Sequence, residues 1–171
     1  MPTPRKGARA ARQIEQEKPH RRLVFEVPLP PTELSPNVGG EWNSHTKRAV
    51  IAARRAYREV VAMYAAAARD VEGWGIVPRV RVSLEVQTRR RKPGLDGLYR
   101  PRDVPNAISA CKALFDGLKL ADWKLDARGR QLGGPGAGLF PDDDHLHMEL
   151  GRVHIDVLHG PGIVVTVEAI E

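Results

Sequence analysis

The strict alternation of side chains between residues 79 and 88 constrains the fold more than any other feature of this sequence. Polar or charged side chains separate a series of apolar and β-branched ones: Val80, Val82, Leu84, Val86 and Thr88. Because successive side chains of a strand point to opposite faces, the segment predicts a β-strand with one buried and one exposed face. The chain must therefore build a sheet that packs other elements against one side.

Three further segments predict the remaining strands of this sheet. Residues Leu23–Leu29 alternate in the same way and lead into a proline-rich loop, which ends the strand. Residues 146–157 and 163–170 alternate again and are separated by a turn sequence rich in glycine and proline. The sheet is therefore expected to take strands from both ends of the chain.

Apolar residues at helical spacing predict two helices. The first begins near Ser44 or Thr46 and runs to about Ala68, and the second covers roughly Pro105–Leu120. One arc of the second helix is apolar and includes Cys111, which we interpret as a buried structural thiol. The other arc is polar: Asn106, Ser109, Lys112 and Asp116. The β-α-β-α-β-β order predicts an α+β fold with two layers, in which the helices pack on one mixed β-sheet.

Length and composition fit one domain with a tail. The 171 residues are 42% hydrophobic, no apolar run is long enough to span a membrane, and the single cysteine excludes an internal disulfide. Residues 1–22 are basic and lack apolar periodicity, so we expect a flexible tail before a domain at 23–171. The glycine-rich residues 122–141 are interpreted as an inserted loop of slack chain. We expect a soluble, cytoplasmic protein with no membrane association.

The distribution of charge indicates a polyanionic partner. The formal net charge is +6, and arginine is commoner than lysine, which favours phosphate recognition because the guanidinium group matches phosphate geometry. Candidate contacts to a nucleic-acid backbone lie between residues 89 and 102: Arg89, Arg90, Arg91, Lys92 and Arg102. A solvated basic surface is the alternative interpretation of this run.

Two acidic positions are candidates for metal binding. Asp142, Asp143 and Asp144 are consecutive, and oxygen ligands of this kind suit Mg²⁺ or Mn²⁺. If the triplet continues a strand, a metal site uses either Asp143 alone or the outer pair. Asp103 stands where the basic loop meets the second helix, so it is either a metal ligand or only the cap of that helix.

Three features, in this order along the chain, resemble a known family. The first is a strand that runs into a Pro-Pro loop with a downstream Asn and Trp: Val27-Pro28-Leu29-Pro30-Pro31, Asn37 and Trp42. The second is a basic run before an Asp-x-Asp-Asn…Lys-x-x-x-Asp-Gly-Leu signature: Asp103-Val104-Pro105-Asn106 and Lys112-Ala113-Leu114-Phe115-Asp116-Gly117-Leu118. The third is an Asp-Asp pair before the closing strands, Asp142-Asp143. Over about residues 23–170 the chain resembles the RusA family of Holliday junction resolvases, particularly its phage-borne members.

The resemblance implies a Mg²⁺-dependent homodimeric endonuclease that nicks branched, four-way DNA in recombination and repair. It places such an enzyme in the cytoplasm of a bacterial or phage-infected cell, with Mn²⁺ as an alternative metal. Carried over by position, the metal ligands are Asp103 and Asp143, with Asp142 beside them. Lys112 then steadies the phosphoryl oxygens, and Asn106 orients the loop.

One position departs from the family pattern and leaves alternatives open. Pro105 stands where the family has its second Asp, so one metal contact is missing, and Asp96, Asp142 and Asp144 are the candidate substitutes. A junction endonuclease is the leading hypothesis. Its rival is a junction-binding protein that has lost cleavage through Pro105. A third interpretation is a basic nucleic-acid-binding domain with an incidental acidic turn.

Overall fold

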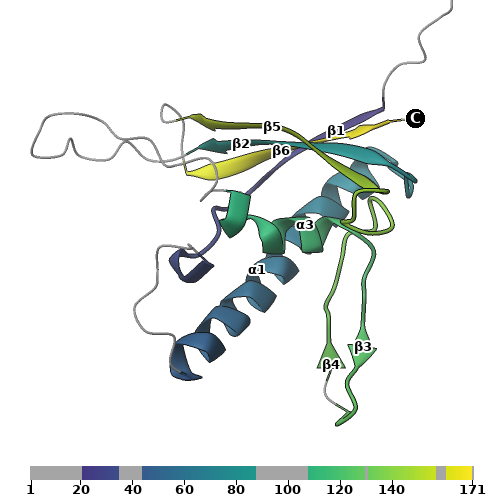
Figure 1. Ribbon diagram of the computed structural model, residues 1–171. Helices are drawn as coiled ribbons and strands as arrows, with labels where there is room; N and C mark the ends of the chain where they lie inside the picture. Colours follow the sequence, from purple (N-terminus) through teal and green to yellow (C-terminus); the bar gives the residue numbers. More distant parts are fainter. Residues whose placement is uncertain (1–20, 35–43, 88–107, 130, 157–160, 171) are drawn as a thin grey trace, which may run out of the picture.

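A computed structural model describes residues 21–34, 44–87, 108–129, 131–156 and 161–170. Its elements follow one another along the chain in this order: β1 (Arg22–Val27), the 3-10 helix η1 (Thr32–Leu34), α1 (Ser44–Val71), β2 (Val80–Gln87), α3 (Lys112–Leu118), β3 (Lys124–Leu125), β4 (Gln131–Leu132), β5 (Met148–Asp156) and β6 (Gly162–Ala169). Figure 1 shows their arrangement.

Four strands form one mixed sheet in the order β1-β6-β2-β5. The C-terminal strand β6 lies between β1 and β2 and is antiparallel to both, whereas β5 is parallel to β2 at the edge. The β2–β5 register shifts once, because Gly151 and Arg152 of β5 together face Ser83 of β2. The alternation at residues 79–88 thus belongs to a central strand with a neighbour on each side.

Helices α1 and α3 lie on one side of the sheet and leave its other side open (Figure 1). The core between the layers combines inward side chains of the strands with apolar residues of both helices, including Val61 from α1 and Leu114 and Leu118 from α3. This arrangement confirms the predicted α+β class, with a mixed sheet and helices packed on it. Cys111 is buried in this core, as the apolar arc predicts.

The boundaries of several elements differ from the expected ones. The second helix is interrupted: residues 108–110 are helical, a turn follows at Cys111, and α3 then begins at Lys112. The domain also begins before residue 23, because β1 starts at Arg22. Arg21 packs its guanidinium over the Trp74 ring, 4.9 Å from the centroid, and donates a hydrogen bond to the Gly73 carbonyl.

The glycine-rich segment packs against the rest of the domain, so its interpretation as a slack loop was wrong. Strands β3 and β4 pair with each other as a two-stranded hairpin, and residues 133–140 return along the C-terminal end of α3. We call residues 133–140 the strap. Its backbone exchanges hydrogen bonds with the chain after α3, such as Gly138 N to the Lys119 carbonyl at 3.0 Å and Leu120 N to the Phe140 carbonyl at 3.0 Å. Its side chains Leu139 and Phe140 are fully buried in the core.

Across the described ranges, no helix is long and apolar enough to cross a membrane.

Candidate active site

A lysine immediately after α3 lies at the centre of the candidate site. The strap and the sheet enclose Lys119, whose side chain is 10% exposed. Its Nζ atom donates hydrogen bonds to Asp142 Oδ1 at 2.7 Å and to Asp143 Oδ1 at 2.8 Å. Two further carboxylates lie slightly farther from Nζ, Asp122 at 3.6 Å and Asp116 at 3.9 Å. We call Lys119 and these four aspartates the Lys119 cluster.

The turn after Phe140 brings the two consecutive carboxylates onto one cation. Residues 142–144 lie outside any strand, so the alternation rule expected for the triplet was wrong. The backbone N–H of Asp143 donates to Asp142 Oδ1 at 2.9 Å, which folds the two side chains toward the same point. The converging pair is therefore Asp142 with Asp143, and neither Asp143 alone nor the outer pair.

Asp144 points away from the cluster. Its Oδ1 atom lies 2.7 Å from His147 Nδ1 and accepts hydrogen bonds from the backbone N–H groups of Leu146 and His147. Although desolvation opposes the change, these hydrogen bonds together lower the pKa of the Asp144 carboxyl. Asp144 thus closes the turn that leads into β5.

Helix α3 contributes one acidic and one basic side chain from its polar arc. Lys112 is exposed, and its Nζ lies 3.7 Å from Asp143 Oδ2. One turn later, Asp116 is partly buried. Burial raises the pKa of the Asp116 carboxyl above its ordinary value, against the attraction of Lys112. Lys112 and Asp116 of the predicted polar arc therefore face the Asp142–Asp143 turn.

Arg58 of α1 binds the cluster through Asp122. This buried guanidinium donates from Nη2 to Asp122 Oδ1 at 2.6 Å, and from Nε to the Pro135 carbonyl at 2.8 Å. The Gly134 N–H donates to the same Asp122 oxygen at 3.0 Å. Although burial opposes the change, the hydrogen bond from Arg58 lowers the pKa of the Asp122 carboxyl. Arg58 therefore joins α1, the cluster and the strap.

The electrostatics of the cluster favour the ionised forms of Asp142 and Lys119. The hydrogen bond from Lys119 lowers the pKa of the Asp142 carboxyl to about 2. Although burial on its own would lower the pKa of Lys119, the hydrogen bonds to Asp142 and Asp143 raise it. At neutral pH an ammonium therefore holds the position at which these two carboxylates converge.

The described side chains provide only part of a binding site for a divalent cation. Oxygen ligands such as Asp142 and Asp143 suit Mg²⁺, but Lys119 Nζ holds the point that they share. Within the described ranges, no group of three or more potential ligands has the geometry of a metal site. The described residues thus supply two converging carboxylates and a cation. A complete set of metal ligands requires further residues, from outside the described ranges.

The structure brings together only part of the site expected from the sequence. Lys112, Asp142 and Asp143 lie in one cluster. The other expected residues lie outside the described ranges: Asp96, Asp103, Pro105, Asn106, Arg89, Arg90, Arg91, Lys92 and Arg102.

Sequence reasoning missed three members of this site. Asp116, Lys119 and Asp122 follow one another at intervals of three residues, and this spacing was the available signal. Arg58, a charged residue of the first helix, is buried because the strap covers it. Its burial depends on a contact 77 residues away, which no local pattern shows.

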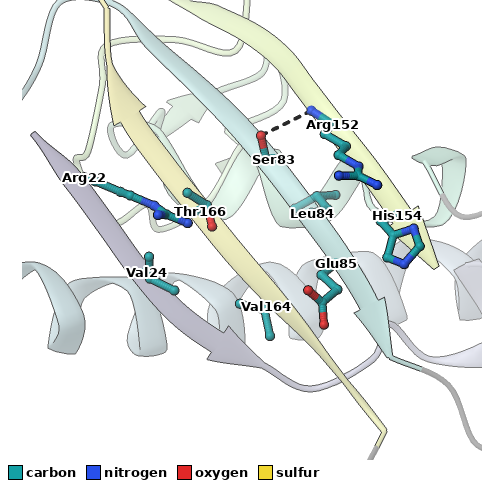
Figure 2. Close-up of a pocket in the computed structure, with 9 residues that line it drawn as sticks. All are labelled: Arg22, Val24, Ser83, Leu84, Glu85, Arg152, His154, Val164 and Thr166. Atoms are coloured by element: carbon teal, nitrogen blue, oxygen red, sulfur yellow. Dashed lines mark hydrogen bonds between the residues drawn. The ribbon is translucent and has the colours of Figure 1, made fainter. Parts of the chain in front are cut away.

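The open face of the sheet carries a separate shallow hollow of about 410 Å³. Figure 2 shows its lining, which comes from all four strands: Arg22, Val24, Ser83, Leu84, Glu85, Arg152, His154, Val164 and Thr166. None of these residues belongs to the Lys119 cluster, which lies on the helix side of the sheet. The hollow is therefore not an extension of the candidate active site.

Comparison with known proteins adds no relative. No family model matches the chain, and no curated protein matches it.

Proposed function

We propose that this protein is a Mg²⁺-dependent endonuclease that cuts four-way DNA junctions, acting as a homodimer in the cytoplasm. One observation carries the proposal. Two of the features that resemble the RusA family lie close together in space. Lys112, from the second feature, has its Nζ atom 3.7 Å from Oδ2 of Asp143, which belongs to the third. A lysine beside converging carboxylates is the arrangement expected where a phosphodiester is held and hydrolysed.

The side chains in and near the Lys119 cluster have different roles in this proposal. Asp142 and Asp143 hold the metal together with Asp103, and the metal supplies an acidified water and neutralises phosphate charge. Lys112 is exposed and contacts a phosphoryl oxygen of the DNA. Lys119 compensates the carboxylates before DNA binds, which keeps the cluster folded without a metal. The basic residues between 89 and 102 contact the backbone of the junction arms.

A second candidate function has specific support. The Lys119 ammonium holds the point where Asp142 and Asp143 converge, and Pro105 removes a family ligand. Both features favour a junction-binding protein that has lost cleavage. Such a protein would still recognise branched DNA through its basic surface.

The test compares a labelled four-way junction with a linear duplex of the same sequence. With Mg²⁺ or Mn²⁺, the endonuclease makes symmetric nicks in the junction that leave 5′-phosphate ends, and EDTA abolishes them. Junction preference in EDTA without cleavage in any metal would instead establish the junction-binding function. Equal affinity for both DNAs and no cleavage would leave only a general nucleic-acid-binding domain.

A further inference from the structure

The β3–β4 hairpin exposes apolar side chains on both of its faces. Trp123 immediately precedes β3 and is 47% exposed, Leu125 is 73% exposed, and Leu132 of β4 is 50% exposed. Because side chains alternate along a strand, Trp123 and Leu125 share one face, while Leu132 lies opposite Lys124 on the other. The two strands pair only with each other, and in Figure 1 the hairpin extends from the end of α3 away from the sheet. In the part of the chain that the structure describes, both faces of the hairpin therefore carry exposed apolar side chains.

The base of this hairpin is fixed to the candidate active site. Asp122, the residue before Trp123, belongs to the Lys119 cluster and is held by Arg58 at 2.6 Å. Gly133, at the other end of the hairpin, has φ +75°, and a Cβ there would overlap the Asp122 carbonyl oxygen. Two-stranded hairpins are marginally stable alone, so this anchoring is what positions the projecting part. Trp123 therefore directly follows a residue of the cluster whose position is fixed.

The charges on the hairpin favour DNA as the molecule that it contacts. Lys124 and Arg128 are exposed. The acidic residue of the turn, Asp126, accepts a hydrogen bond from the Arg128 N–H at 2.8 Å, so its carboxylate serves the turn. A hairpin that carries both exposed cations and an exposed indole offers the two kinds of side chain that bind unstacked bases and their phosphates. A two-stranded ribbon is also narrow enough to enter a DNA groove.

The exposed apolar area is too small for a stable interface with a second copy of the chain. Trp123, Leu125 and Leu132 together expose on the order of 350 Å², given about 150–250 Å² for a large side chain. A stable interface buries about 800 Å² on each partner. A site for one or two bases needs no more area than the hairpin offers.

We propose that the β3–β4 hairpin contacts the branch point of the junction and that Trp123 stacks on an unpaired base there. This inference rests on the proposed function, because it assumes branched DNA at the Lys119 cluster. Trp123 is then a specificity-determining residue: it adds affinity only where a base is free to leave its neighbours, at a branch and not in a linear duplex.

The test measures binding of the full chain to the junction and to the matched duplex by fluorescence anisotropy in EDTA. Trp123→Ala should weaken junction binding by about 5- to 150-fold, the range expected for the loss of one base–aromatic stack. It should leave duplex binding within about twofold. Trp123→Phe should retain most of the junction affinity because any aromatic ring can stack. Ile51→Ala, at an exposed apolar residue of α1 (66%), is the control and should change neither affinity.

A second measurement reports stacking directly. With 2-aminopurine at each branch-flanking position in turn, the wild type should change the probe's fluorescence at one or more positions, and Trp123→Ala should remove that change. If wild type prefers the junction but Trp123→Ala binds it equally well, the hairpin inference is wrong and the proposed function stands. If wild type shows no junction preference, both fail. If Trp123→Ala instead lowers the mass in sedimentation velocity, the hairpin joins two copies and the inference is overturned.

Discussion

Lys119 shows how one side chain can stabilise a site whose other members repel one another. Four carboxylates lie within 3.9 Å of its Nζ atom, and two of them accept hydrogen bonds from it. Carboxylates this close cannot all ionise without a nearby cation. The ammonium therefore does in the free protein what a bound metal would do in a complex with DNA.

Replacing Lys119 by Met should destabilise the protein by about 2–3 kcal/mol. Breaking a fully buried ion pair costs about 3–5 kcal/mol, and the half-exposed Asp142 reduces that loss. Urea denaturation measures the change, with Lys124→Met on the hairpin as the matched control. Mg²⁺ should raise the melting temperature of Lys119→Met more than that of wild type, because it replaces the lost cation only in the native state. Equal losses in the two lysine variants would contradict this role of Lys119.

Acid should weaken the fold through Asp142. The pKa of its carboxyl is about 2 in the native protein and about 3.9 in an unfolded chain, so the native state binds fewer protons. The stabilisation is present above about pH 4 and is lost as the pH falls toward 2. The raised pKa of Asp116 acts in the opposite direction and offsets part of this loss.

Asp142→Asn should therefore flatten the decline in stability between about pH 4 and pH 2. Urea midpoints across this range measure the decline, and Asp70→Asn on α1 serves as the control. A decline in Asp142→Asn as steep as in the control would show that Asp142 does not carry the acid sensitivity.

The strap is the element that turns separate secondary structures into a site. It places Gly134 and Pro135 over Arg58, and Gly136 against the chain that follows α3. Without it, Arg58 would be a surface residue of α1. The hydrogen bonds of the strap to residues 117–120 also fix the position of Lys119.

Gly136→Ala should cost about 1–3 kcal/mol or more, as overpacking does in closely packed regions. A Cβ at this position would overlap the Lys119 carbonyl oxygen, which is backbone and cannot rotate away. Gly75→Ala is the matched control, because a Cβ there meets nothing within 4 Å. Urea midpoints compare the two variants. A Gly136→Ala protein as stable as Gly75→Ala would show that the strap is not packed as described.

The elements differ in how far their sequences predicted them. The strand at residues 80–87 and the first helix follow from periodicity, because each buries one face along its whole length. The strap has no period, since backbone hydrogen bonds to α3 and three buried side chains, Ala137, Leu139 and Phe140, hold it. The site shows the same division: Lys112 and Asp143 were predicted from the signature, whereas Arg58 and Lys119 depend on where the strap lies.

The surface of the domain has two parts: the open face of the sheet, and the side on which the helices pack. The Lys119 cluster and the hairpin lie on the helix side, and the hollow around Arg152 lies on the open face. Arg21, the first described residue, belongs to the domain, because its carbonyl accepts a hydrogen bond from the Ala169 N–H at 2.9 Å.

Deletion of residues 1–20 should leave the melting temperature within about 2 °C of wild type, because their sequence has no apolar period to bury. Arg21→Ala should lower it by more, since the stacking on Trp74 and the bond to the Gly73 carbonyl are lost. Differential scanning fluorimetry compares the two proteins. A larger loss from the deletion than from Arg21→Ala would place the domain boundary earlier in the chain.

Cleavage of a four-way junction by two neighbouring aspartate variants tests the proposed site most directly. Asp143 contacts both Lys112 and Lys119, whereas Asp144 contacts His147 and the backbone of its own turn. With saturating Mg²⁺, Asp143→Asn should abolish cleavage while junction binding in EDTA persists. Asp144→Asn should cleave at close to the wild-type rate. Cleavage by Asp143→Asn at the wild-type rate, or its loss only in Asp144→Asn, would contradict the assignment of the Lys119 cluster as the active site.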